Sequence, residues 1–131
     1  MKIILDNGTE LNPIIVTGGV RYVQGMHRDS LSFVFEESTS LDELEAIFTE
    51  ANCERIIIVE DSGAEYIHKA YTILAELAKK SVMVTPATDE TEAVYETRVF
   101  VSMAQRTYAE NQIAENTAAL NALLTGGNDN V

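Results

Sequence analysis

Three side chains in this sequence have the chemistry of a catalytic or metal site: Cys53, His27 and His68. A protein zinc site takes several Cys, His or carboxylate ligands, usually in pairs a few residues apart, and these three residues lie at no such spacing. Glu50 and Glu54 flank Cys53 and would raise the pKa of its thiol, which favours a buried, idle cysteine over a nucleophile. We therefore expect no metal site and no catalytic residue among them.

Motifs that position a nucleophile or a phosphate are also missing from the sequence. It contains no Gly-x-Ser-x-Gly motif, and Gly18-Gly19 is not followed by the Lys-Ser/Thr of a phosphate-binding loop. The acidic clusters do not alternate as calcium ligands do in an EF-hand, so we expect them to be solvated. These clusters are Asp42-Glu43-Glu45, Glu60-Asp61 and Asp89-Glu90-Glu92. The sequence thus predicts a protein that is not an enzyme and holds no cofactor.

Charge and hydropathy limit the partners of the chain. It has 131 residues, the size of one domain, and a net charge of −12 from 21 acidic and 9 basic residues. A field of that sign repels phosphate backbones and anionic lipids, so we expect neither nucleic-acid nor membrane partners. No apolar run approaches the ~20 residues of a membrane span, and no signal peptide is evident. We expect synthesis in the cytoplasm without an export signal.

Strand signals dominate the first hundred residues. Asn7-Gly8 lies between apolar flanks, which predicts a hairpin with a type I′ turn. Gly18-Gly19 is expected to break or bulge the next strand, and residues 25–30 are expected to be a connection. The segments with β-branched residues or apolar alternation are 14–16, 20–23, 31–36, 55–60, 66–73 and 94–103.

Helix signals are fewer. Ser40 and Glu43 have the spacing of a capping box, and apolar residues follow at helical spacing, which predicts a short helix at about 40–50. Residues 73–80 are ambiguous, because their propensities favour helix whereas alternation from Ile67 to Leu77 favours strand. We interpret them as strand, since the hairpin would otherwise be too short to pair with residues 55–60.

Together these elements predict a mainly β protein of the α+β class. We expect an antiparallel β-sandwich or partly open barrel, with a short helix at about 40–50 and a C-terminal helix at about 104–124. Thr125-Gly126-Gly127 is expected to end that second helix. The predicted organisation is a β-rich domain over residues 1–103, followed by a helix and short polar tail over residues 104–131.

The predicted C-terminal helix carries a narrow apolar stripe. Ile113, Asn116, Leu120 and Leu123 recur at alternating spacings of three and four, as at the a and d positions of a coiled coil. An isolated helix of this length is marginal in water, so it must pack on something. Two alternatives are open for the chain by itself: the helix folds back on the sheet, or it leaves the domain and self-associates, with Asn116 fixing the register. Docking of the helix into a different protein is a third outcome.

Five segments in order form a recognisable pattern: Ile4–Glu10, Val20–Gly25, Ser40–Leu44, Tyr66–Thr72 and Met103–Glu110. This pattern resembles small structural proteins encoded among the tail and baseplate genes of tailed phages and prophages of Gram-positive bacteria. The resemblance implies a β-sandwich or partly closed barrel with one small helix, repeated around a symmetric particle. It also implies a place in the virion tail with other tail proteins as partners, and no catalytic residues.

Three functions are compatible with these features. The first is a virion structural protein, a baseplate component or fibre adaptor, that forms a homo-oligomer, with a trimer favoured. The second is a soluble binding module whose helix packs on the sheet and which binds a small ligand, a glycan or a host protein. The third is a small hydrolase or glycan-binding domain, disfavoured by the lack of Trp, that would use Tyr22, Tyr66, Tyr71 and Tyr95 as stacking surfaces.

Overall fold

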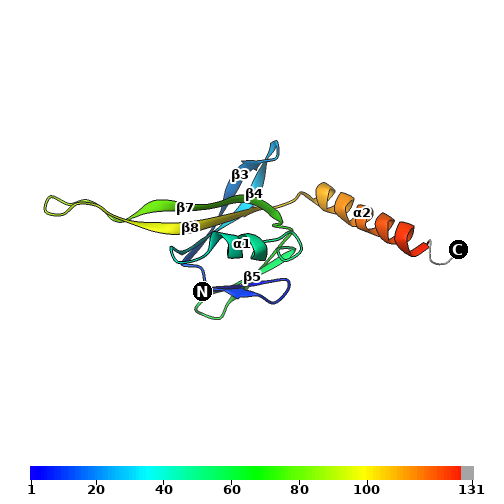
Figure 1. Cartoon of the computed structure of the whole chain (residues 1–131), viewed down its shortest axis with the longest axis horizontal. Coiled ribbons are helices and arrows are strands. Elements are labelled where there is room, and N and C mark those ends of the chain that lie inside the picture. The colour runs from blue at the N-terminus through cyan, green and yellow to red at the C-terminus, as the bar shows by residue number, and fades with distance from the viewer. Residues whose placement is uncertain (128–131) are drawn as a thin grey trace.

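The computed structural model describes residues 1–127 and consists of two four-stranded antiparallel sheets that form an open sandwich (Figure 1). In order across the first sheet, the strands are β2 (Glu10–Leu11), β1 (Lys2–Leu5), β5 (Arg55–Val59) and β6 (Glu65–Lys69). In order across the second sheet, they are β3 (Ile15–Val23), β4 (Met26–Glu36), β8 (Val94–Ala104) and β7 (Ile73–Thr85). Two helices complete the fold, α1 (Leu41–Ile47) and α2 (Tyr108–Gly127). The predicted mainly β, α+β sandwich is confirmed; the polar tail predicted after residue 127 lies outside the described residues.

The core lies between the inner faces of the two sheets. Alternate residues of each strand point inward, so Ile3, Phe33, Ile56 and Val101 are all fully buried. Helix α1 closes one side of the sandwich, because Phe48 at its C-terminal end packs on the Phe33 ring at a centroid distance of 5.5 Å. This single core accounts for the buried apolar residues of both sheets and of α1.

Helix α1 begins where the sequence predicts but ends sooner. The Oγ of Ser40 accepts a hydrogen bond from the backbone N–H of Glu43 at 3.3 Å, so Ser40 is the N-cap. The helix ends at Ile47 rather than near residue 50, because the Phe48 backbone departs from helical geometry while its N–H still bonds Leu44.

The hairpin predicted at Asn7-Gly8 is present, but its turn type differs from the one expected. Gly8 alone has a positive φ, +87°, and its N–H donates to the Leu5 carbonyl at 2.9 Å, which defines a type I turn followed by a left-handed glycine rather than type I′. The β3–β4 hairpin instead has positive φ at both Gln24 (52°) and Gly25 (80°), as type I′ requires. Residues 26–30, predicted to be a connection, are therefore the first part of β4.

Gly18-Gly19 does not break or bulge β3, so that prediction is wrong. Gly18 pairs with Leu31 and Gly19 with Ser30 in an unbroken register. Strand β3 is an edge strand, and no atom lies within 4 Å of the position a Cβ would take at either glycine. The ladder hydrogen bonds hold the backbone extended there, so the permissiveness of glycine has no structural consequence.

Residues 73–80 are strand, as predicted. They are not needed, however, to lengthen the hairpin that pairs with residues 55–60. Strand β6 ends at Lys69, and its five residues already pair with the whole of β5. Ala70, with φ +66°, turns the chain into the other sheet, where β7 begins at Ile73. The alternation from Ile67 to Leu77 therefore spans two strands of different sheets.

The positive φ of Ala70 yields a stability prediction. A left-handed conformation costs a residue with a Cβ roughly 1–2 kcal/mol, and glycine avoids most of that cost. We expect Ala70→Gly to raise the free energy of unfolding by up to about 1 kcal/mol in urea titrations. Ala64, whose φ is not positive, is the matched control, and Ala64→Gly should give no such gain. A destabilised Ala70→Gly protein would contradict the assignment of strain.

Candidate assembly interface: the junction, helix α2 and the arm

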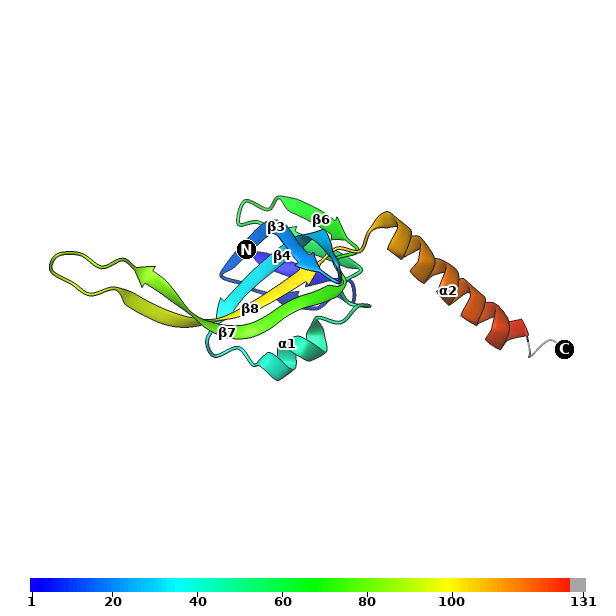
Figure 2. The ribbon, with the colours of Figure 1, turned by 90° about the horizontal axis from the view of Figure 1, so that it is seen from above.

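Two structures project from opposite sides of the sandwich (Figures 1 and 2). On one side β7 and β8 continue beyond the body as a long hairpin, and we call residues 81–97 the arm. On the other side the chain leaves β8 and runs out as α2, connected by residues 105–107, which with the first turn of α2 form the junction. The candidate site is therefore a set of protruding surfaces, not an enclosed cavity.

Residues 105–107 of the junction are not helical, which corrects the prediction that the C-terminal helix begins at about residue 104. The Gln105 N–H donates to the Asp29 carbonyl at 2.8 Å, and the Arg106 N–H donates to the Ala70 carbonyl at 2.9 Å. The Gln105 side chain also donates to the Lys69 carbonyl at 3.0 Å. These hydrogen bonds hold residues 105 and 106 against the ends of the sheets, and the helix begins at Tyr108.

Arg28 of β4 is the centre of the junction. Its side chain is 2% exposed and its guanidinium makes a bidentate ion pair with Glu110, in the first turn of α2, with Nη2 donating to Oε2 at 2.7 Å. Its Nε donates to the Val23 carbonyl at 3.0 Å, and its Nη1 donates to the Gln105 carbonyl at 3.2 Å. The hydrogen bonds from Arg28 hold the pKa of Glu110 at about 2, below its usual value.

Glu110 also completes a capping box that the sequence reasoning missed. The Thr107 N–H donates to Glu110 Oε1 at 2.9 Å, and the Glu110 N–H donates to Thr107 Oγ1 at 3.2 Å. The Thr-x-x-Glu spacing of 107–110 was the available signal for the true start of α2, just as Ser40-x-x-Glu43 was for α1. This capping box is tied to the body of the protein because Glu110 also pairs with Arg28, which is 82 residues away in sequence.

Arg106 fixes the junction from its other side. Its guanidinium bonds Glu50 at 2.8 Å and Glu54 at 2.5 Å, both in the segment between α1 and β5. The Arg106 side chain is largely buried, which strengthens these ion pairs relative to surface ones. Body elements therefore hold both flanks of the helix base, and the direction of α2 is set by these bonds.

The predicted seam residues, Ile113, Asn116, Leu120 and Leu123, all lie on α2 and are all exposed. The exposed fractions of the three apolar members are 56–71%. The opposite face of the helix looks toward the body, because Ala114 and Ala118 line a hollow there with Glu50 and Glu54. In this chain the seam faces away from the sandwich, so folding back on the sheet, the first of the two open alternatives, is not what the structure shows.

Helix α2 is also longer at its C-terminal end than predicted. It runs through Gly127, so Thr125-Gly126-Gly127 is part of the helix and does not end it. At about 1.5 Å per residue, its 20 residues extend roughly 30 Å from the junction. The whole seam therefore lies within continuous helix.

The arm carries exposed apolar side chains of its own. Met83 of β7 is directly opposite Tyr95 of β8, and their exposed fractions are 55% and 61%. Strand alternation places this pair on the same face as Leu77 and Val101, which face the core nearer the body. The arm thus extends the inner face of the second sheet beyond the first sheet, which covers that face nearer the body.

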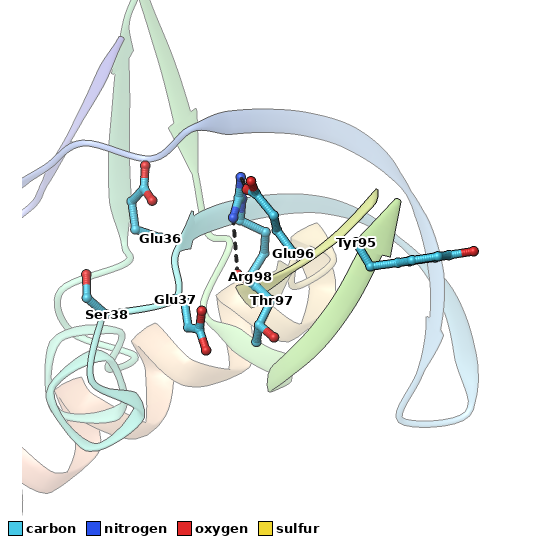
Figure 3. A pocket seen from close by; sticks show the side chains of 7 residues that line it. All are labelled: Glu36, Glu37, Ser38, Tyr95, Glu96, Thr97 and Arg98. Carbon is cyan, nitrogen blue, oxygen red and sulfur yellow. Dashed lines mark hydrogen bonds and ion pairs between the residues drawn. The ribbon is translucent and has the colours of Figure 1, made fainter. Parts of the chain in front are cut away.

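An open hollow of about 680 Å³ lies at the base of the arm (Figure 3). It is lined by Glu36, Glu37, Ser38, Tyr95, Glu96, Thr97 and Arg98. Arg98 ion-pairs with Glu96, and the Tyr95 ring points away from the other lining side chains (Figure 3). Of the remaining carboxylates, Glu36 is the last residue of β4 and Glu37 lies in the turn before α1.

The candidate chemical residues are dispersed. Cys53 is fully buried, and burial together with Glu54 raises the pKa of its thiol to about 12. His27 packs edge-on to Tyr22, whereas His68, expected to face solvent, is partly buried against Tyr71, which lowers its pKa. Its register opposite buried Ile56 explains that position. Within residues 1–127, no group of three or more His, Cys, Asp and Glu could hold a metal ion.

The tyrosines proposed as stacking surfaces lie on different elements. Tyr22 is on β3, Tyr66 is on β6, Tyr95 is on the arm, and Tyr71 follows β6. Across residues 1–127, no ring contact joins two of them. The structure gives them no common platform.

The fold and the projections define a class: an open antiparallel β-sandwich with a hairpin arm and a terminal helix held at its base. Neither the protein-family models, nor the curated proteins, nor the solved structures contain a match to this chain. Among residues 1–127, no helix has both the length and the apolarity needed to cross a bilayer.

The Arg28–Glu110 pair predicts a pH dependence. The pKa of Glu110 is lower in the folded protein than its ordinary 4.5, so its stabilising contribution is complete above about pH 4.5 and is lost as the pH falls toward 2. In Glu110→Gln that part of the acid dependence should be absent, and the Tm at pH 7 should fall by several degrees. Glu115→Gln, on the exposed helix surface, is the control. Equal acid-unfolding curves for the wild type and Glu110→Gln would contradict the prediction.

Proposed function

We propose that this protein is a non-enzymatic assembly subunit that forms a homo-oligomer through the seam of α2, as a structural component of a phage or prophage tail. A baseplate or fibre-adaptor position and other tail proteins as partners follow from the sequence resemblance. The observation that carries the assembly role is the seam itself: a helix held at its base presents a row of apolar side chains to solvent.

The energetic argument starts from the exposed side chains. Fully burying a Leu or Ile side chain stabilises a complex by about 1.5–3 kcal/mol. Ile113, Leu120 and Leu123 are each more than half exposed, so the isolated chain leaves most of that free energy unused. Association of copies through α2 is the arrangement that recovers it without moving the junction.

The residues beside the seam also favour self-association. With Ile113 and Leu120 at a positions, the flanking e and g positions are Gln112, Thr117, Ala119 and Leu124. None is charged, so copies of a chain with net charge −12 can bring these helices together without like-charge repulsion along the seam. Leu124, also exposed, widens the apolar stripe, which suits a bundle of three or more helices.

The alternative binding module requires the helix to cover the sheet. The face of α2 turned toward the body carries Ala114 and Ala118, which bury little surface. Turning the seam inward would require rotation of α2 and separation of Glu110 from the buried Arg28. These contacts support the self-associating arrangement over the packed one.

Substitution of the seam tests the proposal. We expect the wild type to sediment as a defined oligomer at micromolar concentration and Leu120→Glu/Leu123→Glu to sediment as a smaller species, because buried carboxylates without partners are costly. The Tm of the sandwich should change little, since these side chains do not contact it. Ala118→Glu/Ala122→Glu, on the opposite face, is the matched control. Indistinguishable sedimentation of the seam variant and the wild type would remove the proposal.

Asn116 gives a second prediction. A buried polar residue at a seam position costs stability but selects one register and oligomer number. We expect Asn116→Leu to raise the thermal stability of the oligomer and to broaden its mass distribution in native mass spectrometry. Ala118→Leu, an exposed position outside the a, d, e and g positions, is the control. A less stable oligomer of unchanged number would show that Asn116 has another role.

A further inference from the structure

The arm has an unusual charge distribution. Between Ser81 and Thr97 there is no Lys or Arg, whereas Asp89, Glu90, Glu92 and Glu96 are all present and exposed. Among these four carboxylates, and within the described residues 1–127, only Glu96 makes an ion pair, with Arg98 at the base of the arm. The far end of the arm is therefore negatively charged, next to the exposed Met83–Tyr95 pair.

A surface with complementary properties lies on the first sheet. The outward-facing residues Ile4, Ile57 and Ile67 form a continuous row across β1, β5 and β6, because Ile4 pairs with Ile57 and Ile57 pairs with Ile67. Their neighbours Ile3, Ile56 and Ile58 face the core instead. We call this row the isoleucine face; its outermost member, Ile67, is 58% exposed.

Cations flank the isoleucine face at one end. Arg55 and Lys69 are directly opposite each other on the same side of the sheet, two residues along each strand from Ile57 and Ile67. Like charges in this position destabilise a sheet. Arg55 has Asp6 at 3.6 Å, but within residues 1–127 no ion pair involves Lys69. In a chain of net charge −12, Arg55 and Lys69 therefore form a small positive patch whose charge Asp6 neutralises only in part.

We infer that the arm of one copy docks on the isoleucine face of a second copy, with Met83 and Tyr95 against the isoleucine row and Glu90 and Glu92 near Arg55 and Lys69. The inference rests on the proposed self-association and adds a second, different contact to it. The arm points away from its own body, so it reaches such a surface only on another molecule (Figure 2).

The geometry of this contact determines the kind of assembly. The arm and the isoleucine face are different surfaces, so the contact is head-to-tail and each copy keeps one free arm and one free face. Such contacts close into a ring or continue as a filament. The α2 seam, in contrast, joins identical surfaces into a closed bundle. Loss of the arm contact should therefore leave the bundle, and loss of the seam should leave arm-dependent association.

Charge reversal in the full-length chain tests the contact. We expect Glu90→Lys/Glu92→Lys to weaken the larger assembly about tenfold or more in sedimentation at about 0.05 M salt, with a smaller difference at about 0.5 M. Arg55→Glu/Lys69→Glu should have the same effect, and combining the two pairs should restore association. Glu37→Lys/Glu45→Lys, with the same change in charge on exposed residues elsewhere, is the matched control. Unchanged Tm values establish that each variant is folded.

The apolar part has its own variant. Met83→Ser/Tyr95→Ser should weaken association at both salt concentrations, because the loss does not depend on screening. Normal association of the arm variants, or failure of the combined reversal to restore it, would overturn the arm contact. Dissociation by Leu120→Glu/Leu123→Glu alone would then still support the seam. A wild type that remains monomeric in all conditions would overturn both.

Discussion

The arrangement of this molecule depends on the buried guanidinium of Arg28. A charged group taken out of water must have its donors bonded, and Arg28 bonds two backbone carbonyls and the Glu110 carboxylate. Because Glu110 also caps the first turn of α2 through Thr107, the helix cannot tilt without leaving a buried charge unpaired. This coupling of an ion pair to a capping box makes a connection of a few residues behave as a rigid joint. The bonds of Arg106 to Glu50 and Glu54 add a second point of attachment.

This rigid connection determines which surfaces the exposed apolar residues of α2 can contact. On a freely hinged helix, Leu120 and Leu123 could cover any nearby apolar surface of the same chain. On a helix held at its base, with alanines turned toward the body, they remain available to other molecules. Exposed apolar rows of this kind are characteristic of interaction surfaces, and the arm presents a second one on the opposite side of the sandwich. The two projections, unlike in structure and in charge, suit the formation of two different contacts.

The high negative charge of the chain mainly limits which surfaces of two copies can come into contact. Most surfaces of two copies repel each other, so association is favoured only where charge is absent or opposite in sign. The seam meets the first condition, since the positions beside it are uncharged. The isoleucine face meets the second, since Arg55 and Lys69 lie where the acidic arm of a neighbour could reach. In the proposed assembly, repulsion between the other surfaces would limit misassembly.

The local elements of this protein were determined by sequence patterns of short range. Ser40 and Glu43 located the start of α1, alternation located β8, and the three–four spacing placed the four seam residues on one face of a helix, because each of these depends on neighbours within a few residues. Turn chemistry was less decisive: Asn7-Gly8 forms a hairpin turn of a different type from the one expected, and the type I′ turn lies at Gln24-Gly25. Only the tertiary structure decided that 66–80 divides between two sheets, that Arg28 is buried and that α2 points outward. Those outcomes depend on contacts between residues far apart in the chain, such as Arg28 and Glu110, and no periodicity in the sequence encodes which distant partners meet.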